Sequence, residues 1–122
     1  MKIYYDTFSG KVRRFTEKLP YDAQCISEVT DVQEPFVLIT YTFGFGEVPK
    51  ATAQFLAQHG QYLRGVASSG NRIWGANFAK SADTIAEQWK VPKLLKFEMA
   101  GTEGDVASFV KAYEALRATI QV

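Results

Sequence analysis

The stretch FVLITYTFGFGEVP, residues 36–49, decides the fold of this chain. Its first part, residues 36–41, is a continuous apolar run rich in β-branched side chains, which is typical of a strand buried on both faces of a parallel sheet. Residues 43–46 (FGFG) then alternate two large rings with two residues that have no side chain. Pro49 cannot lie inside a central strand but suits the first turn of a helix. The stretch therefore predicts a buried strand, a loop and a helix in succession.

Strand-like patterns recur on both sides of this stretch. Only residues 30–35 separate the second strand from the third, which is too short for a crossover helix, so we expect a plain loop there. The other strands are separated by helix-like patterns, and this alternation implies a doubly wound parallel sheet with helices on both faces. The predicted strands are residues 2–6, 24–29 (the weakest), 36–41, 64–68 and 93–99.

Four helices are predicted from apolar residues at three- and four-residue spacing. Pro20 ends the first helix, and Thr102 with Asp105 three residues later marks the start of the last one. The apolar positions are Val12, Phe15 and Leu19; Phe55, Leu56, His59 and Leu63; Phe78, Ala82, Ile85, Ala86 and Trp89; and Val106, Phe109, Val110, Tyr113 and Leu116.

Length and composition limit the possible classes of protein. A chain of 122 residues fits one domain, so we expect residues 1–122 to form a single unit. The formal net charge of +1 removes the bulk electrostatic argument for binding nucleic acid or a membrane. Cys25 has no partner for an internal disulfide, and the single histidine leaves little material for a metal site. The chain starts with the strand-like MKIYYD and no signal-peptide pattern, so we expect a cytoplasmic protein.

Residues 7–12 (TFSGKV) form the first of three unusual loops, each of which follows a predicted strand. In open parallel sheets, ligands bind beyond the carboxyl ends of the strands. The hydroxyl groups of Thr7 and Ser9, with Gly10 at a helix start, predict a phosphate site. An ordinary capped helix start explains the same residues equally well. The loop lacks the Walker and Gly-x-Gly-x-x-Gly patterns, which argues against nucleoside triphosphates and dinucleotides.

The second loop contains Phe43, Gly44, Phe45 and Gly46. A plain turn explains the glycines, because both tolerate positive φ, but it does not explain two exposed rings. Similar glycine-aromatic runs occur in RNA-binding sheets, where the rings stack on bases. The following Glu47-Val48-Pro49 does not fit such a strand, so RNA binding is strongly disfavoured.

The third loop, residues 68–78 (SSGNRIWGANF), combines hydrogen-bonding side chains, two glycines and the stacking face of Trp74. Taken alone, a surface loop with Trp74 folded onto the core is the slightly better interpretation. The three loops together favour a ligand with a phosphate at one end and a heteroaromatic ring at the other.

The order of elements and the first loop resemble flavodoxins, which bind FMN. Residues 7–12 match the flavodoxin phosphate loop, Ser/Thr-x-Thr-Gly-x-Thr, only in part. A closer resemblance is to the NrdI family, the small flavodoxin-like activators of class Ib ribonucleotide reductase. It extends from the first strand to the last helix and rests on residues 40–49 (TYTFGFGEVP), 65–75 (GVASSGNRIWG), 78–83 (FAKSAD) and 96–98 (KFE).

This resemblance implies a flavodoxin-like five-stranded parallel sheet of order 2-1-3-4-5, in a short form without the helix between strands 2 and 3. It also implies a two-electron FMN protein that acts on the small, radical-bearing reductase subunit. In the family, reduced flavin converts dioxygen to superoxide, which oxidises a dimanganese site to form the manganese(III)–tyrosyl radical cofactor. The chain would be an accessory flavoprotein rather than an enzyme with its own substrate, and a flavodoxin or ferredoxin-type reductase would supply electrons.

Two other functions stay open at this point. One is a general electron-transfer flavodoxin that serves several reductases. The other is a module of the same fold that binds a different ligand or partner and carries no flavin.

The resemblance also implies a set of site residues. Gly44 and Phe45 would modulate the redox behaviour of the flavin, because glycine lets the peptide beside the ring rotate. Lys11 stands where relatives often have Asn, so only its backbone amide is expected to contribute. The predicted FMN-binding residues are Thr7, Ser9, Gly10, Lys11 and Val12 at the phosphate; Tyr41, Thr42, Phe43, Gly44 and Phe45 along one wall; and Ser69, Gly70, Asn71, Trp74, Gly75, Asn77 and Phe78 along the other.

Several conspicuous residues are expected to be structural. His59 and Cys25 are interpreted as half-buried packing residues. Glu47 follows the ring loop, and contact with a partner and no role at all are equally open for it; Arg72 is expected to make the site less negative. Trp89 and Phe109 are expected to pack in the core, and Asp83, Glu87 and Lys90 to form a solvated helix face.

Overall fold

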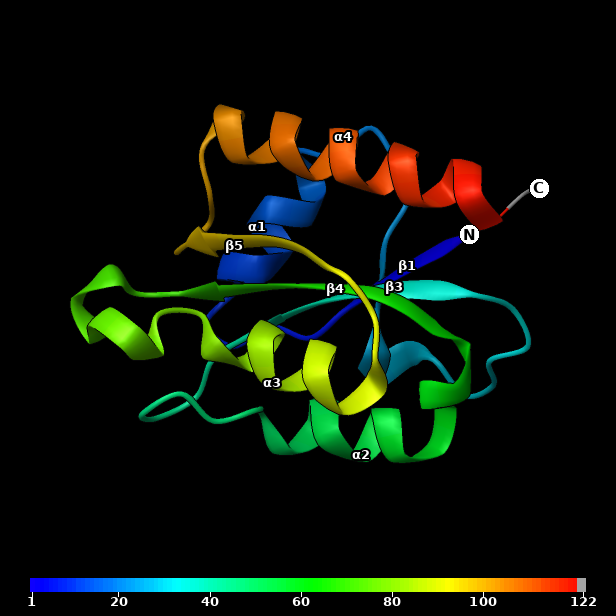
Figure 1. Cartoon of the computed structure of the whole chain (residues 1–122), viewed down its shortest axis with the longest axis horizontal. Helices are drawn as coiled ribbons and strands as arrows, with labels where there is room; N and C mark the ends of the chain where they lie inside the picture. Colours follow the sequence, from blue (N-terminus) through cyan, green and yellow to red (C-terminus); the bar gives the residue numbers. More distant parts are fainter. Residues whose placement is uncertain (121–122) are drawn as a thin grey trace.

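The computed structural model describes residues 1–120, and in it one parallel sheet of five strands lies between two layers of helices. The strand order is β2-β1-β3-β4-β5, as the resemblance implied. Helices α1 and α4 cover one face of the sheet, and α2 and α3 cover the other (Figure 1). The strands are β1 (Lys2–Tyr5), β2 (Gln24–Cys25), β3 (Phe36–Tyr41), β4 (Leu63–Gly70) and β5 (Lys93–Glu98), and the helices are α1 (Lys11–Glu17), α2 (Lys50–His59), α3 (Lys80–Trp89) and α4 (Glu103–Ile120).

Alternate residues of the strands feed two separate cores. Along β3, Val37 and Ile39 pack toward α1 and α4, whereas Phe36 and Leu38 pack toward α2 and α3. All four side chains are fully buried, which explains why this strand is apolar throughout. The first core includes Phe109, as predicted, with Phe15, Phe97 and Tyr113.

The second strand is shorter than the sequence predicted. Residues 24–29 were expected to be extended, but β2 contains only Gln24–Cys25, which pair with Tyr4 and Tyr5. The chain then turns into a short 3₁₀ helix, η1 (Ile26–Glu28), which buries Ile26 in the core beneath α2. The expected absence of an α-helix between β2 and β3 is confirmed within the described residues.

The fourth strand is longer than predicted at both ends. Leu63 was assigned to the preceding helix, but α2 ends at His59, the 3₁₀ helix η2 (Gly60–Tyr62) follows, and Leu63 opens β4. At the other end Ser69 and Gly70 were expected to stop the strand. They continue it instead, because Ser69 aligns with Tyr41 on one side and with Phe97 on the other.

The start of α4 confirms the predicted cap. The Thr102 hydroxyl accepts from the Asp105 N–H at 3.1 Å, and the Asp105 carboxylate accepts from the Thr102 N–H at 2.8 Å. This reciprocal pair satisfies two amides that a helix start otherwise leaves free. No helix within residues 1–120 is long and apolar enough to cross a membrane.

One residue of the predicted solvated face of α3 was predicted wrongly, whereas Glu87 and Lys90 are exposed as expected. Asp83 was expected to point into solvent with Glu87 and Lys90, but its carboxylate pairs with Lys93 and Lys96 of β5. Burial raises the pKa of Asp83, but hydrogen bonds and charge from the two lysines outweigh burial and leave it below the ordinary value of 3.8. The sequence offered no local signal, because the partners lie ten or more residues away.

Candidate functional site

A cavity of about 630 Å³, measured with its solvent-filled mouth, opens at the carboxyl edge of the sheet. The loops that follow β1, β3, β4 and β5 enclose it, as the position of ligand sites in open parallel sheets predicts. Its lining residues are Phe8, Ser9, Lys11, Val12, Tyr41, Thr42, Gly44, Ser69, Gly70, Asn71, Trp74, Asn77, Ala79 and Met99.

The loop after β1 presents unused backbone donors. Ser9 and Gly10 both have left-handed conformations, with φ of 60° and 81°. Two successive residues of this kind turn their amides toward one side, which makes a concave anion site. Within residues 1–120 the N–H groups of residues 8–12 have no hydrogen-bond acceptor, whereas the Thr7 hydroxyl already accepts from Arg13 N–H at 3.4 Å. The loop can therefore hold an anionic group through its backbone.

The loop after β3 forms a closed five-residue turn. Phe43 N–H donates to the Glu47 carbonyl at 2.8 Å, and Glu47 N–H donates to the Phe43 carbonyl at 2.7 Å. Gly44 and Gly46 have positive φ values of 55° and 112°, which side chains disfavour. At the tip, Phe45 is 72% exposed and contacts Trp74 edge to face at a ring distance of 5.3 Å. The two loops that flank the cavity therefore meet at this ring pair.

The loop after β4 contains the short 3₁₀ segment η3 (Arg72–Asn77), which begins at an Asn71 cap. The Asn71 side-chain oxygen accepts from Ile73 N–H at 3.1 Å. Glu98 of β5 holds the next residue, accepting from Arg72 N–H at 3.0 Å, and lies 3.7 Å from its guanidinium. These bonds attach the start of η3 to its own Asn71 cap and to β5.

Most of the predicted site residues come together in this cavity. Three residues that line it were not predicted: Phe8, Ala79 and Met99. The rule that ligands gather at carboxyl strand ends could have pointed to Met99, which directly follows β5. The predicted residues that line the cavity are Ser9, Lys11, Val12, Tyr41, Thr42, Gly44, Ser69, Gly70, Asn71, Trp74 and Asn77; those outside its lining are Thr7, Gly10, Phe43, Phe45, Gly75 and Phe78.

Phe78 has a packing role in the structure. Its ring lies below the Arg72 guanidinium, 4.6 Å from the ring centre, and the Lys96 ammonium is 5.7 Å from the same centre. Cations are attracted to the negative face of an aromatic ring. Phe78 therefore anchors the far end of the loop to β5 instead of facing the cavity.

Burial changes the ionisation of two residues near the cavity. Burial raises the pKa of Tyr41, and the negative charge of Asp6 raises it further, so the phenol stays protonated at neutral pH. Asp6 follows β1 directly and is 8% exposed. Burial raises its pKa above 3.8, although hydrogen bonds from the Thr52 hydroxyl and the Thr7 N–H oppose the shift. The Asp6 carboxylate has no cationic partner among the described residues.

The sheet order and the position of the cavity define a flavodoxin-like protein. Two solved structures of flavodoxins share this fold. Their sequence identity to this chain is low, so the likeness supports the fold and not the function. One is a short-chain flavodoxin associated with a PDU bacterial microcompartment, with a TM-score of 0.75, 22% identity, and coverage of 97% of this chain and 96% of that one. The other is a flavodoxin from Streptococcus pneumoniae TIGR4, with a TM-score of 0.72, 20% identity and coverage of 97% of both chains.

Sequence comparison then shows the family. Residues 3–111 match the family described as "NrdI Flavodoxin like". A curated relative, "Protein NrdI" of Bacillus licheniformis, is 50% identical over 115 residues, which cover 93% of this chain and 88% of the relative. The chain belongs to the NrdI flavodoxin-like family, as its motifs predicted.

FMN is the cofactor of this family, and the cavity fits it. The unused amides of residues 8–12 provide donors for a phosphate at one end. Tyr41 and Trp74 provide aromatic surface in the walls, and Gly44 and Gly70 line the cavity between them. The contact of each individual residue with FMN stays a prediction.

Proposed function

We propose that this chain is the FMN-carrying activator of a class Ib ribonucleotide reductase. When bound, FMN supplies two-electron storage and the reduction of dioxygen to superoxide, the oxidant for the dimanganese site of the small reductase subunit. The observation that carries the proposal is a cavity with phosphate donors and aromatic walls in a chain of the NrdI family. The protein groups orient the cofactor and set its electrostatic surroundings, because the electron chemistry belongs to the flavin.

The backbone of the first loop would hold the phosphate, and Lys11 would add positive charge beside it. Arg72 contributes a second cation near the third loop, where its guanidinium lies over Phe78. A near-neutral chain with cations at this edge should store a reduced, anionic ring more readily than a strongly acidic flavodoxin would.

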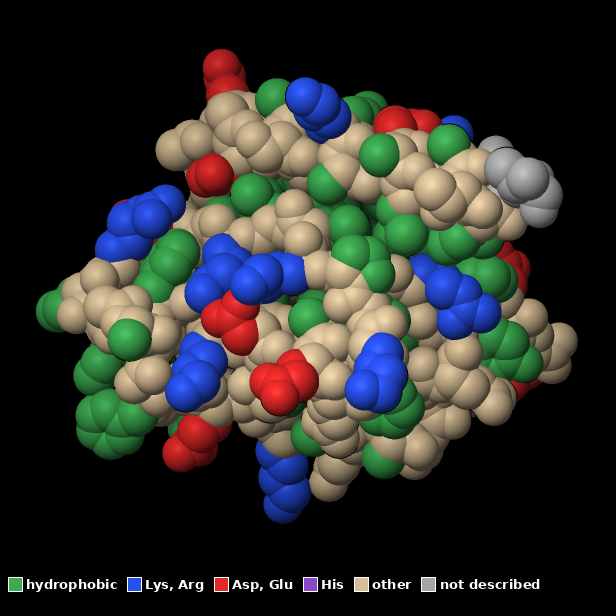
Figure 2. Space-filling model, viewed as in Figure 1, with side chains coloured by type: hydrophobic (Ala, Val, Ile, Leu, Met, Phe, Trp, Pro, Cys, Tyr) green, Lys and Arg blue, Asp and Glu red, His purple; other side chains and the backbone are tan. Residues whose placement is uncertain are grey.

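The rim of the cavity supports docking on a protein partner. Within residues 1–120, the strongly exposed large hydrophobic side chains all belong to the loops or strand ends at this edge. Figure 2 shows hydrophobic side chains exposed at the left end of the molecule, where these loops lie in Figure 1. Large exposed apolar patches on a protein surface often mark interaction sites. The residues are Phe8, Phe43, Phe45, Ile73, Trp74 and Met99, between 37% and 78% exposed.

The remaining parts of the proposal follow from this role. The small, radical-bearing subunit of the reductase would dock on this rim. A flavodoxin or ferredoxin-type reductase would supply the electrons. We further propose that residues 1–122 act as one domain and that the protein is cytoplasmic.

The test uses the purified protein, reconstituted with FMN and reduced without oxygen. It is mixed with oxygen and a manganese-loaded class Ib small subunit, and the tyrosyl radical is measured by electron paramagnetic resonance. We expect radical with the wild type, and less with Ile73→Ser, which removes an exposed rim side chain outside the cavity lining. Lys111→Ser on α4 is the matched surface control.

Three other outcomes would contradict the proposal. A colourless protein that cannot be reconstituted with FMN excludes both redox functions. An FMN protein that gives no radical, yet passes electrons to several acceptors, identifies a general electron-transfer flavodoxin. Equal radical yield from Ile73→Ser and the wild type would exclude the rim as the docking surface.

A further inference from the structure

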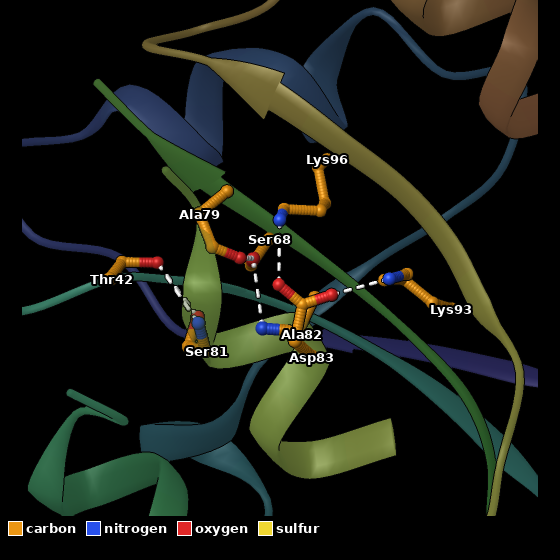
Figure 3. A network of polar contacts seen from close by, with 8 residues as sticks. All are labelled: Thr42, Ser68, Ala79, Ser81, Ala82, Asp83, Lys93 and Lys96. Carbon is orange, nitrogen blue, oxygen red and sulfur yellow. Dashed lines mark hydrogen bonds and ion pairs between the residues drawn. The ribbon is translucent and has the colours of Figure 1, made fainter. Parts of the chain in front are cut away.

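Hydroxyl groups at the start of α3 connect this helix to the ends of β3 and β4 (Figure 3). Ser81 is fully buried in the first turn of the helix. Its hydroxyl donates to the Tyr41 carbonyl at 2.8 Å and lies 3.0 Å from the Thr42 hydroxyl. Its backbone N–H donates to the same Thr42 hydroxyl at 3.4 Å. Residues about 40 positions apart in the sequence are therefore joined by three contacts.

The number of protons fixes the direction of these bonds. A serine hydroxyl has one proton, and that of Ser81 is used at the Tyr41 carbonyl. Thr42 must therefore donate its own proton to Ser81 Oγ, while its oxygen accepts from the Ser81 N–H. With its proton engaged, the Thr42 hydroxyl can accept a hydrogen bond from a ligand in the cavity but cannot donate one.

A second serine fixes the other wall to the same helix start. The Ser68 hydroxyl donates to the Ala79 carbonyl at 2.8 Å and accepts from the Ala82 N–H at 3.1 Å. Ala79 lines the cavity and has a left-handed φ of 47°. Ser68 is fully buried in β4. The start of α3 therefore sets the position of both walls relative to each other.

We call residues 41–47, which end and follow β3, the near wall, and its tip is held less firmly than its base. The Phe43 carbonyl is held by the N–H groups of Gly46 and Glu47, at 3.3 and 2.7 Å. The next peptide is free: the Gly44 carbonyl and the Phe45 N–H have no hydrogen-bond partner within residues 1–120. The near wall therefore has a fixed base at Tyr41 and a free peptide at its tip.

We infer that Ser81 is a positioning residue for the flavin: it holds the base of the near wall, at Tyr41 and Thr42. The inference rests on FMN binding, as proposed above. Ser81 does not line the cavity, so it acts only through the residues it holds. Its removal leaves the Tyr41 carbonyl without its donor and lets the base of the wall move.

The test compares Ser81→Ala with Ser81→Cys, in which a thiol, a much weaker hydrogen-bond donor, replaces the buried hydroxyl. Tyr113→Phe is the matched control, because it loses one side-chain hydrogen bond, to the Met1 carbonyl at 2.7 Å, in the core beneath α4. Affinity for FMN and for riboflavin is measured by quenching of flavin fluorescence, and the two one-electron potentials by anaerobic titration.

We expect Ser81→Ala to bind FMN about tenfold more weakly, the size of effect for a buried acceptor left without its donor. Riboflavin should lose affinity by the same factor, since the bonds support the ring wall and not the phosphate loop. The gap between the two potentials should change as well, which a general loss of stability would not produce. Tyr113→Phe should bind both ligands as the wild type does.

Wild-type affinities and potentials in Ser81→Ala would overturn the inference while leaving FMN binding intact. A loss confined to FMN would also overturn it, because it would place the effect at the phosphate. If Ser81→Ala fails to fold, Ser81→Cys decides in the same way, because it fills the same space with a much weaker hydrogen-bond donor. A wild type that binds neither flavin would instead refute the proposed function itself.

Discussion

Replacing Gly70 with alanine should destabilise the protein through a steric clash at the cavity wall. A Cβ atom at Gly70 would lie 2.4 Å from the Ala79 nitrogen and 2.8 Å from its Cα. Both are backbone atoms, and Ala79 is already held in a left-handed conformation by its bond to Ser68. The neighbour cannot move without breaking this bond. We expect a cost near the upper end of overpacking, about 3 kcal/mol.

Two other glycines separate this clash from backbone strain. Gly75 has a φ of 54° but open space around its Cβ position, so alanine there should cost only the left-handed penalty, about 1–2 kcal/mol. Gly104 lies in the first turn of α4 with ordinary φ and no close neighbour. Alanine at that position should stabilise the protein by about 0.5–1 kcal/mol.

The assay is urea unfolding of the three variants without FMN, since a bound ligand would add its own stabilisation. With an m-value of about 2 kcal/mol per molar urea, the urea concentration at the unfolding midpoint should fall by about 1.5 M for Gly70→Ala. It should fall less for Gly75→Ala and rise for Gly104→Ala. A Gly70→Ala midpoint equal to that of the wild type, or a larger loss at Gly75, would refute the packing argument.

Three further predictions concern charge and the flavin loop. Gly44→Val should change the potentials of the reduced state more than the free energy of unfolding, because Gly44 has a φ of 55° and directly precedes the unbonded Gly44–Phe45 peptide. Redox titration measures the potentials, and urea titration measures the free energy of unfolding. Asp6→Asn should remove a pH dependence: the raised pKa of Asp6 means that the folded state binds the proton more tightly, so wild-type stability should rise relative to the variant as the pH falls toward 3.8. A constant difference across pH would contradict it. Arg72→Glu should lower the potential of the second electron, because it replaces a cation beside Glu98 with an anion, and an unchanged titration would exclude this role.

The sheet and the place of the site could be predicted because they depend on regular patterns. A buried apolar run at residues 36–41 and the alternation of strands with helices leave few topologies, and the carboxyl edge follows from the parallel arrangement. The exposure of Phe43 and Phe45, at 56% and 72%, could be predicted because Pro49 prevents the strand from continuing through them.

The features that were missed depend on contacts between distant residues. Asp83 has the local sequence of a solvated helix position, and only the packing of α3 against β5 brings two lysines to it. Ser81 likewise has the sequence of an ordinary first-turn residue, and its partners lie about 40 residues away. The second strand was predicted too long, because two residues of pairing carry almost no pattern.

The division of the near wall into a fixed base and a free tip bears on how a flavin site of this kind can bind tightly and still respond to redox state. Loop ordering on binding costs affinity, so a wall held in place beforehand by Ser81 and by the Phe43–Glu47 pair lowers that cost. A wall held at every peptide could not change its contacts when the redox state of the ligand changes, because a conformational shift requires different contacts in each state. One unbonded peptide at Gly44, in a loop that is otherwise fixed, satisfies both requirements. For this reason the Ser81 and Gly44 variants should differ in their effect on affinity: the first should weaken flavin binding and also change the potentials, whereas the second should change the potentials with little loss of affinity.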